Sequence, residues 1–187
     1  QLISKGFHFP NLNCIVVLDI DLTLNGYDLR ASEKNLQLYH QLSGRAGRAG
    51  KPATVYFQTY NIESKIISQI TNINPDIFLE KELEIRKKNN LPPYERFISI
   101  ILSGKNEKKI EIFSTNLKKK LDKNLSARIL GPVVAPIFKI NKNFRYRILI
   151  RSKKSEKIQK NLSKILNNFK NQKEIKLAVD VDPISFN

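Results

Sequence analysis

Two arginines lie three residues apart in the segment QLSGRAGRAG, residues 41–50. Only glycine and alanine surround Arg45 and Arg48, and such small side chains let another molecule approach the backbone and both guanidinium groups closely. A guanidinium is a planar, permanently charged fork that binds two oxygens at once. This segment therefore indicates contact with an anion that has several oxygens, above all phosphate.

The same segment does not fit a phosphate-binding loop of the G-x-x-x-x-G-K-[ST] type. Arg45 occupies the place of the first glycine, and Pro52 occupies the place of the Ser or Thr that would hold Mg²⁺. The two histidines, His8 and His40, are far apart in the sequence, and Cys14 is the only cysteine. We therefore expect no metal site and no internal disulfide within this chain.

The charge of the chain predicts an anionic partner. The formal net charge is +16, with a pI of about 9.9, which is typical of proteins that bind nucleic acid or an acidic membrane. No apolar run approaches the roughly 20 residues of a membrane span, so we expect no membrane partner and a cytoplasmic location. The 187 residues contain no methionine, so the chain is expected to be a piece of a longer protein.

The positive charge is concentrated in the second half. Residues 94–187 carry 22 Lys and Arg against 8 Asp and Glu, a net charge of +14. The composition changes beside the segment NNLPPYE (89–95), where two prolines favour a break in regular secondary structure and thus a domain boundary. We predict three parts: an α/β part over 1–61, a helical connector over 62–93 and a basic domain over 94–187.

The first part alternates strands and helices. The apolar run 14–20 predicts a buried parallel strand, and 53–60 predicts a second strand. Helices are predicted over 31–44 and 75–88, so the fold class is α/β with a parallel sheet. Asp19 and Asp21 follow the first strand at its carboxyl end, where α/β sheets place ligands, although a solvated turn explains them equally well.

The basic domain has six expected segments. Strands are predicted over 96–104, over the short pair 127–131 and 135–140, and over 144–150 and 175–181. Helices are predicted over 107–121 and 154–170 from apolar residues that recur at helical spacing. The order β-α-β-β-α-β predicts an α+β, ferredoxin-like (split βαβ) domain.

Three motifs resemble those of the PriA family of replication-restart helicases. The chain has KGFHFP at 5–10, QLSGRAGR at 41–48 and DVDP at 180–183, in the family's order and across nearly the whole sequence. The resemblance implies that 1–61 is the later part of a RecA-like helicase lobe 2, carrying motifs V and VI. The threonine that precedes Gln1 in motif V is missing, and the loop 24–30 departs from the family pattern.

The resemblance implies an ATP-dependent 3′–5′ DNA helicase, a hydrolase that restarts stalled replication forks and assembles the primosome. ATP and Mg²⁺ would be bound mainly by lobe 1, which lies upstream in the family together with a cysteine-rich zinc segment. Neither segment is in this sequence. We therefore expect the chain alone to be inactive. The alternative is a non-enzymatic, basic adaptor module that binds nucleic acid.

The resemblance also assigns roles around the nucleotide. Arg48 is expected to be the catalytic arginine finger, with Arg45 holding the phosphate beside it. Gln41 and Gly6 join these arginines as nucleotide-binding residues. The alternative reading of the arginines is a basic helix end that stabilises its own C-terminus.

DNA and partner contacts complete the prediction. Branched and single-stranded DNA are the expected nucleic-acid partners, in a bacterial, nucleoid-associated protein. Other primosome proteins and the acidic tail of single-strand DNA-binding protein are the expected protein partners. The alternative explanation for His8 is a histidine packed at a strand edge. The alternative for the lysines of the basic domain is an ordinary solvated helix face. The expected DNA-binding residues are Lys5, His8, Lys118, Lys119, Arg145 and Arg147, and the expected tail-binding residues are Lys154, Lys157 and Gln159.

Overall fold

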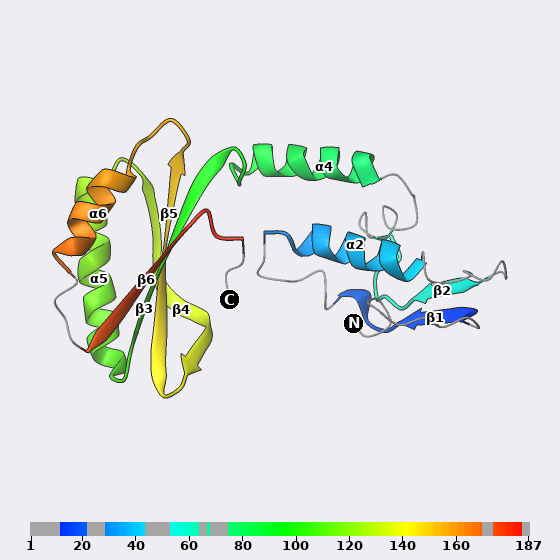
Figure 1. The fold of residues 1–187 in the computed structure, drawn as a ribbon, viewed down its shortest axis with the longest axis horizontal. Coiled ribbons are helices and arrows are strands. Elements are labelled where there is room, and N and C mark those ends of the chain that lie inside the picture. Colours follow the sequence, from blue (N-terminus) through cyan, green and yellow to red (C-terminus); the bar gives the residue numbers. More distant parts are fainter. Residues whose placement is uncertain are drawn as a thin grey trace. The chain divides into compact units, whose positions relative to one another are not determined.

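The computed structural model describes residues 12–21, 29–43, 53–63, 67, 75–169 and 174–184, shown in Figure 1. The chain forms two compact units, residues 1–81 and 82–187. The division falls within helix α4 (Pro75–Lys88), which lies inside the predicted connector.

The first unit contains a parallel pair of strands, as predicted. Strand β1 (Cys14–Val17) pairs with β2 (Thr54–Phe57), with Cys14 opposite Thr54 and Val17 opposite Phe57. Both strands are shorter than the predicted 14–20 and 53–60. Backbone hydrogen bonds continue the pairing past the strands, because Gln58 N donates to Val17 O at 2.9 Å.

Helix α2 (Ala31–Ser43) supplies the core of this unit. Tyr39 and Leu42 are buried with Ile15, and the ring of Tyr39 meets that of Phe57 edge-on at 5.3 Å between centroids. The prediction of a buried strand over 14–20 holds for one face only, on which Ile15 is buried. Val16 is 56% exposed, because among the described residues this core forms on only one side of the strand.

The second unit has the predicted β-α-β-β-α-β order. Its strands form one antiparallel sheet in the order β4-β5-β3-β6, and both helices lie on the same side of that sheet in Figure 1. The elements are β3 (Glu95–Gly104), α5 (Glu107–Asn124), β4 (Arg128–Ile140), β5 (Asn143–Lys153), α6 (Gln159–Asn167) and β6 (Ile175–Val181).

Strand β4 is continuous where two short strands were predicted. Its pairing with β5 shifts register between Leu130 and Val133, and again between Val134 and Lys139. A proline falls in each irregular stretch (132 and 136), where the missing N–H removes a ladder hydrogen bond. Gly131 has a φ of +96°, a conformation that side chains disfavour, and a Cβ there would lie 2.7 Å from the carbonyl oxygen of Arg147.

The hydrophobic core of the second unit lies between the sheet and its helices. Alternate residues of β3 and β5, such as Ile100 and Ile148, are fully buried against α5 residues such as Leu117. Helix α5 begins at an N-cap, since the Asn106 side chain accepts a hydrogen bond from Lys109 N at 3.1 Å. Because side chains alternate along a strand, the remaining residues of β5 lie on the face away from the helices.

Candidate nucleic-acid interface

Of the residues predicted to contact nucleotide, the structure describes one. Gln41 lies in the last turn of α2 with its side chain exposed. Gly6, Arg45 and Arg48 lie outside the described residues, as do the predicted DNA contacts Lys5 and His8. Their roles stay predictions.

The carboxylate of Asp21 joins the carboxyl ends of the two parallel strands. Thr59 Oγ1 donates to both of its oxygens at 3.0 Å, and Tyr60 N donates to Oδ2 at 2.8 Å. Both partners come directly after β2. The sequence was compatible with either a ligand-binding role or a solvated turn for Asp21. The contacts in the structure give its carboxylate a structural role, because they close the loop that follows β2.

Three arginines of β5 lie on the sheet face away from the helices. Arg145 pairs across the sheet with Ser103, and Arg147 pairs with Ile101. Arg151 lies on the same face, two positions beyond Leu149. A row of guanidinium groups along one strand is suited to an extended polyanion, whose charges also recur along a line.

Arg145 and Arg147 are neighbours on this face and repel each other. Burial lowers the pKa of Arg147, and the charge of Arg145 lowers it further. The guanidinium of Arg147 nevertheless remains protonated at neutral pH, since arginine does not lose its proton in proteins. Arg145 Nη1 also donates to the carbonyl oxygen of Ile137 at 3.3 Å, which holds it against β4. An anion bound beside the pair would relieve the repulsion.

Arg151 has a different environment from the other two. Its Nε donates to Glu95 Oε2 at 3.1 Å, and its Nη2 donates to the carbonyl oxygens of Asn89 (3.1 Å) and Asn90 (2.8 Å). The guanidinium also lies 5.2 Å from the centre of the Phe97 ring. These contacts join the end of α4 to β3 and β5. No local pattern in the sequence indicates these contacts, because the partners are 54 to 62 positions away in the chain.

Lys118 and Lys119, predicted to bind DNA with the β5 arginines, lie on α5 instead. Helix α5 packs on the other face of the sheet, so the structure does not bring the four residues together. Lys118 Nζ contacts Asp122 Oδ2 at 2.5 Å, an i,i+4 pair that partly neutralises it. Lys119 is exposed. The predicted DNA-binding set is therefore divided between two faces.

The predicted tail-binding residues lie together at the start of α6. Lys154 and Lys157 are exposed in the turn after β5, and Gln159 is the first residue of the helix. Gln159 also lines an apolar groove of about 290 Å³ between α6 and β6. No single stretch of sequence indicates this groove, because its walls come from two elements. The groove residues are Leu162, Ser163, Leu166, Asn167, Leu177, Val179 and Val181.

Neither a metal site nor a membrane span is found in the part of the chain that the structure describes. Among those residues, no three His, Cys, Asp or Glu side chains gather closely enough to hold an ion. No described helix is both long and apolar enough to cross a bilayer.

The second unit is thus a basic α+β domain with an arginine-bearing sheet face, and it matches a known family. The family described as "Primosomal protein N C-terminal domain" matches residues 87–184. Proteins named replication restart protein PriA are similar over the whole chain. The relative from Rickettsia conorii is 41% identical over 186 residues, and the relative from Bacillus subtilis is 34% identical over 188. The chain belongs to the PriA family.

The chain corresponds to only part of these relatives. The alignment covers 100% of this chain and 28% of the Rickettsia conorii protein, and 98% and 23% for Bacillus subtilis. The chain therefore spans about a quarter of the length of the curated relatives it matches. Among solved structures, the de novo designed protein Foldit4 matches 48% of this chain at a TM-score of 0.39 and 16% identity, too weak a likeness to support a fold assignment.

Proposed function

We propose that this chain is a part of an ATP-dependent 3′–5′ DNA helicase that acts in replication restart. The family and the printed names of the relatives support that role. In this proposal the first unit is the later part of a RecA-like lobe 2, consistent with its parallel strand pair. The second unit is a ferredoxin-like domain, consistent with its β4-β5-β3-β6 sheet and two helices on one side.

The second unit contributes DNA binding through the sheet face away from its helices. The observation that carries this proposal is the pair Arg145 and Arg147, held side by side on the face away from the helices. Guanidinium groups contact phosphate oxygens irrespective of the base attached. The domain therefore holds DNA mainly by its backbone, and base identity matters little.

Replacing both arginines tests this face. In the 187-residue chain, Arg145→Gln with Arg147→Gln is expected to weaken DNA binding by about tenfold or more at moderate salt. Two lost phosphate contacts should also reduce the slope of log K against log salt by about 1.8 for duplex DNA. Fluorescence anisotropy with labelled duplex, single-stranded and forked DNA over a salt series measures both quantities.

A matched control removes the same charge from the opposite face. Lys118→Gln with Lys119→Gln alters α5 and should leave affinity within about twofold, because these lysines lie away from the arginine row. Equal losses in both double variants would show that only total charge matters, and the proposed face would be wrong. Circular dichroism confirms that each variant is folded.

A second role is supported by the groove beside α6. We propose that Lys154, Lys157 and Gln159 bind the acidic tail of single-strand DNA-binding protein, with the apolar end of the tail in the groove. The groove accepts an apolar side chain, and the adjacent lysines attract carboxylates. Val179 and Val181 are 41% and 48% exposed in its wall, so apolar surface is available there.

Peptide binding tests this second role. Lys154→Ala with Lys157→Ala is expected to weaken binding of an acidic peptide ending in Phe by about tenfold, since charge attraction there is lost. Lys160→Ala with Lys164→Ala, at exposed positions within α6 itself, is the control and should change little. If the first variant loses DNA affinity but retains the peptide, these lysines serve DNA instead.

A further inference from the structure

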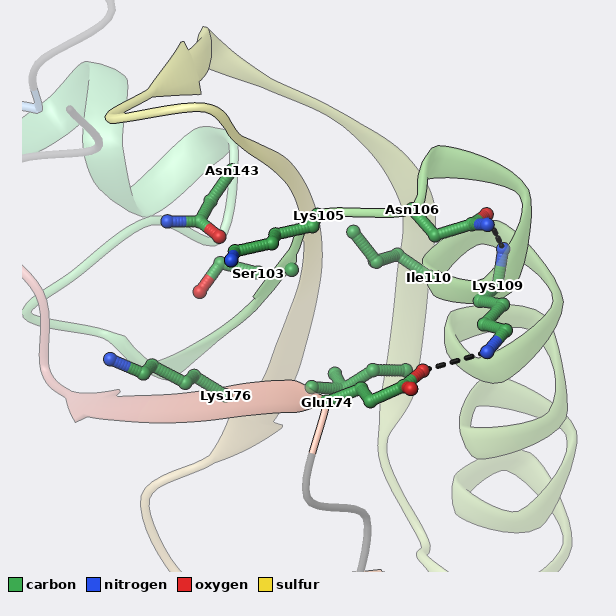
Figure 2. Close-up of a pocket in the computed structure, with 10 residues that line it drawn as sticks. Ser103, Lys105, Asn106, Lys109, Ile110, Asn143, Glu174 and Lys176 are labelled. Carbon is green, nitrogen blue, oxygen red and sulfur yellow. Dashed lines mark hydrogen bonds and ion pairs between the residues drawn. The ribbon is translucent and has the colours of Figure 1, made fainter.

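A pocket of about 610 Å³ opens at one end of the second unit's sheet. Figure 2 shows the residues around it, which come from the end of β3, the turn into α5, the first turn of α5 and the starts of β5 and β6. The polar side chains are contributed by Ser103, Lys105, Asn106, Lys109, Asn143, Glu174 and Lys176. Neither the predicted DNA-binding residues nor the predicted tail-binding residues line it.

Gly104 allows the strands to meet closely at this end. A Cβ at this position would lie 2.7 Å from the carbonyl oxygen of Glu174, so only glycine lets β6 begin directly against the end of β3. The resulting register places Lys176 opposite Ser103. The next residue, Lys105, leads into α5 from the rim of the same pocket.

One of the three pocket lysines is neutralised and two are not. Lys109 Nζ contacts Glu174 Oε2 at 2.7 Å, and this hydrogen bond and the lysine charge lower the pKa of the Glu174 carboxyl. Glu174 therefore stays ionised and offsets Lys109. None of the ion pairs found among the described residues involves Lys105 or Lys176. The pocket keeps a net charge of +2 at its rim.

The pocket continues the arginine row of β5. Ser103 is paired with Arg145 on one side and with Lys176 on the other, so all three lie in one line across the sheet. Neighbouring strands are about 4.8 Å apart, which places the Cα atoms of Arg145 and Lys176 roughly 10 Å from each other. A nucleic-acid strand whose backbone follows the arginines along β5 thus reaches the pocket at Asn143, and it then turns across the sheet to reach Lys176.

We propose that this pocket binds a phosphate group of a nucleotide, with Lys105 and Lys176 supplying the charge. The Ser103 hydroxyl and the Asn143 amide supply hydrogen-bond donors. The volume exceeds what a phosphate alone needs and is typical of small-molecule sites, so the sugar and base attached to the phosphate also fit. As a binding site on a DNA strand, the pocket rests on the proposed function of the arginine face.

Titrations of the 187-residue chain test the site directly. Amide NMR signals of Lys105 and Lys176 and the side-chain amide of Asn143 are followed with inorganic phosphate, with dTMP and with a dT oligonucleotide. All three ligands should shift these signals. Tighter binding of the oligonucleotide identifies a DNA strand as the ligand, and equal affinity for dTMP identifies a free nucleotide. Absence of shifts with every ligand overturns the proposal.

Paired substitutions separate the pocket from the arginine face. Lys105→Gln with Lys176→Gln should weaken oligonucleotide binding at least fivefold and lower the salt slope by about 1.4, the single-strand value for two contacts. Lys108→Gln with Lys123→Gln, exposed on α5 outside the pocket, is the matched control. Equal losses in both pairs overturn the site. If only the Arg145 and Arg147 variant loses DNA binding, the phosphate pocket is refuted and the arginine face is supported. If only the Lys105 and Lys176 variant loses binding, the arginine face is refuted and the pocket is supported.

Discussion

In a full-length protein containing this chain, Arg48→Ala is expected to lower the kcat of DNA-stimulated ATP hydrolysis by at least about 10³. The transition state spreads negative charge over the γ-phosphoryl oxygens, and a guanidinium from the second lobe stabilises it. The loss corresponds to about 4 kcal/mol at 1.36 kcal/mol per decade. DNA affinity should be nearly unchanged, because Arg48 is proposed to contact nucleotide alone.

Two comparisons make this result specific. Arg48→Lys should restore little activity, since an ammonium cannot reproduce the bidentate fork. The 187-residue chain alone should show no turnover above that of its own Arg48→Ala form. Near-normal ATP hydrolysis in full-length Arg48→Ala would place the arginine finger elsewhere, and Arg45→Ala would then be the next variant to measure.

Arg151→Ala is expected to destabilise the second unit by about 2–3 kcal/mol, because charge-assisted hydrogen bonds are worth roughly 1.5–3 kcal/mol each before solvent screening. Its side chain is only 17% exposed and that of its partner Glu95 is 22% exposed, so screening is modest. The substitution also leaves the carbonyl oxygens of Asn89 and Asn90 without this donor. Urea unfolding followed by circular dichroism measures the loss.

Arg145→Ala on the same strand is the matched control for this stability effect. Arg145 makes one longer hydrogen bond, to the carbonyl oxygen of Ile137, so its loss should cost about 1 kcal/mol or less. Amide hydrogen exchange at Ile148 and Ile150, buried in the second unit, reports that unit alone. If Arg151→Ala lowers the free energy of unfolding by less than about 0.5 kcal/mol, its effect is that of an ordinary surface substitution. Such a result would refute the stabilising role of Arg151.

The order of elements could be predicted from the sequence because each element carries a local pattern. Phe144, Tyr146 and Ile148 alternate with Arg145 and Arg147 in the sequence, and in the structure the apolar set packs into the core with the helices. The two-strand prediction for 127–140 failed for a physical reason. Prolines interrupt the pattern of β4, but the strand continues through both register shifts, and no local signal distinguishes an interrupted strand from two short ones.

The candidate nucleic-acid interface could be predicted only in part, because local sequence patterns do not show which distant strands pair with one another. Arg145 and Arg147 were identified from charge, whereas the separation of Lys118 from them required the sheet and helix packing. The pocket was missed entirely. Lys105 and Lys176 are far apart in the chain, and they share one rim only because β6 pairs beside β3.

The irregularity of β4 has a consequence for association between molecules. Strand β4 lies at an edge of the sheet, and a regular edge strand is a template on which another chain can add a strand. The stretches around prolines 132 and 136 break the edge into short runs of regular backbone, with too few consecutive donors for stable addition. The β4 edge of the sheet is thereby protected against the addition of a strand from another molecule.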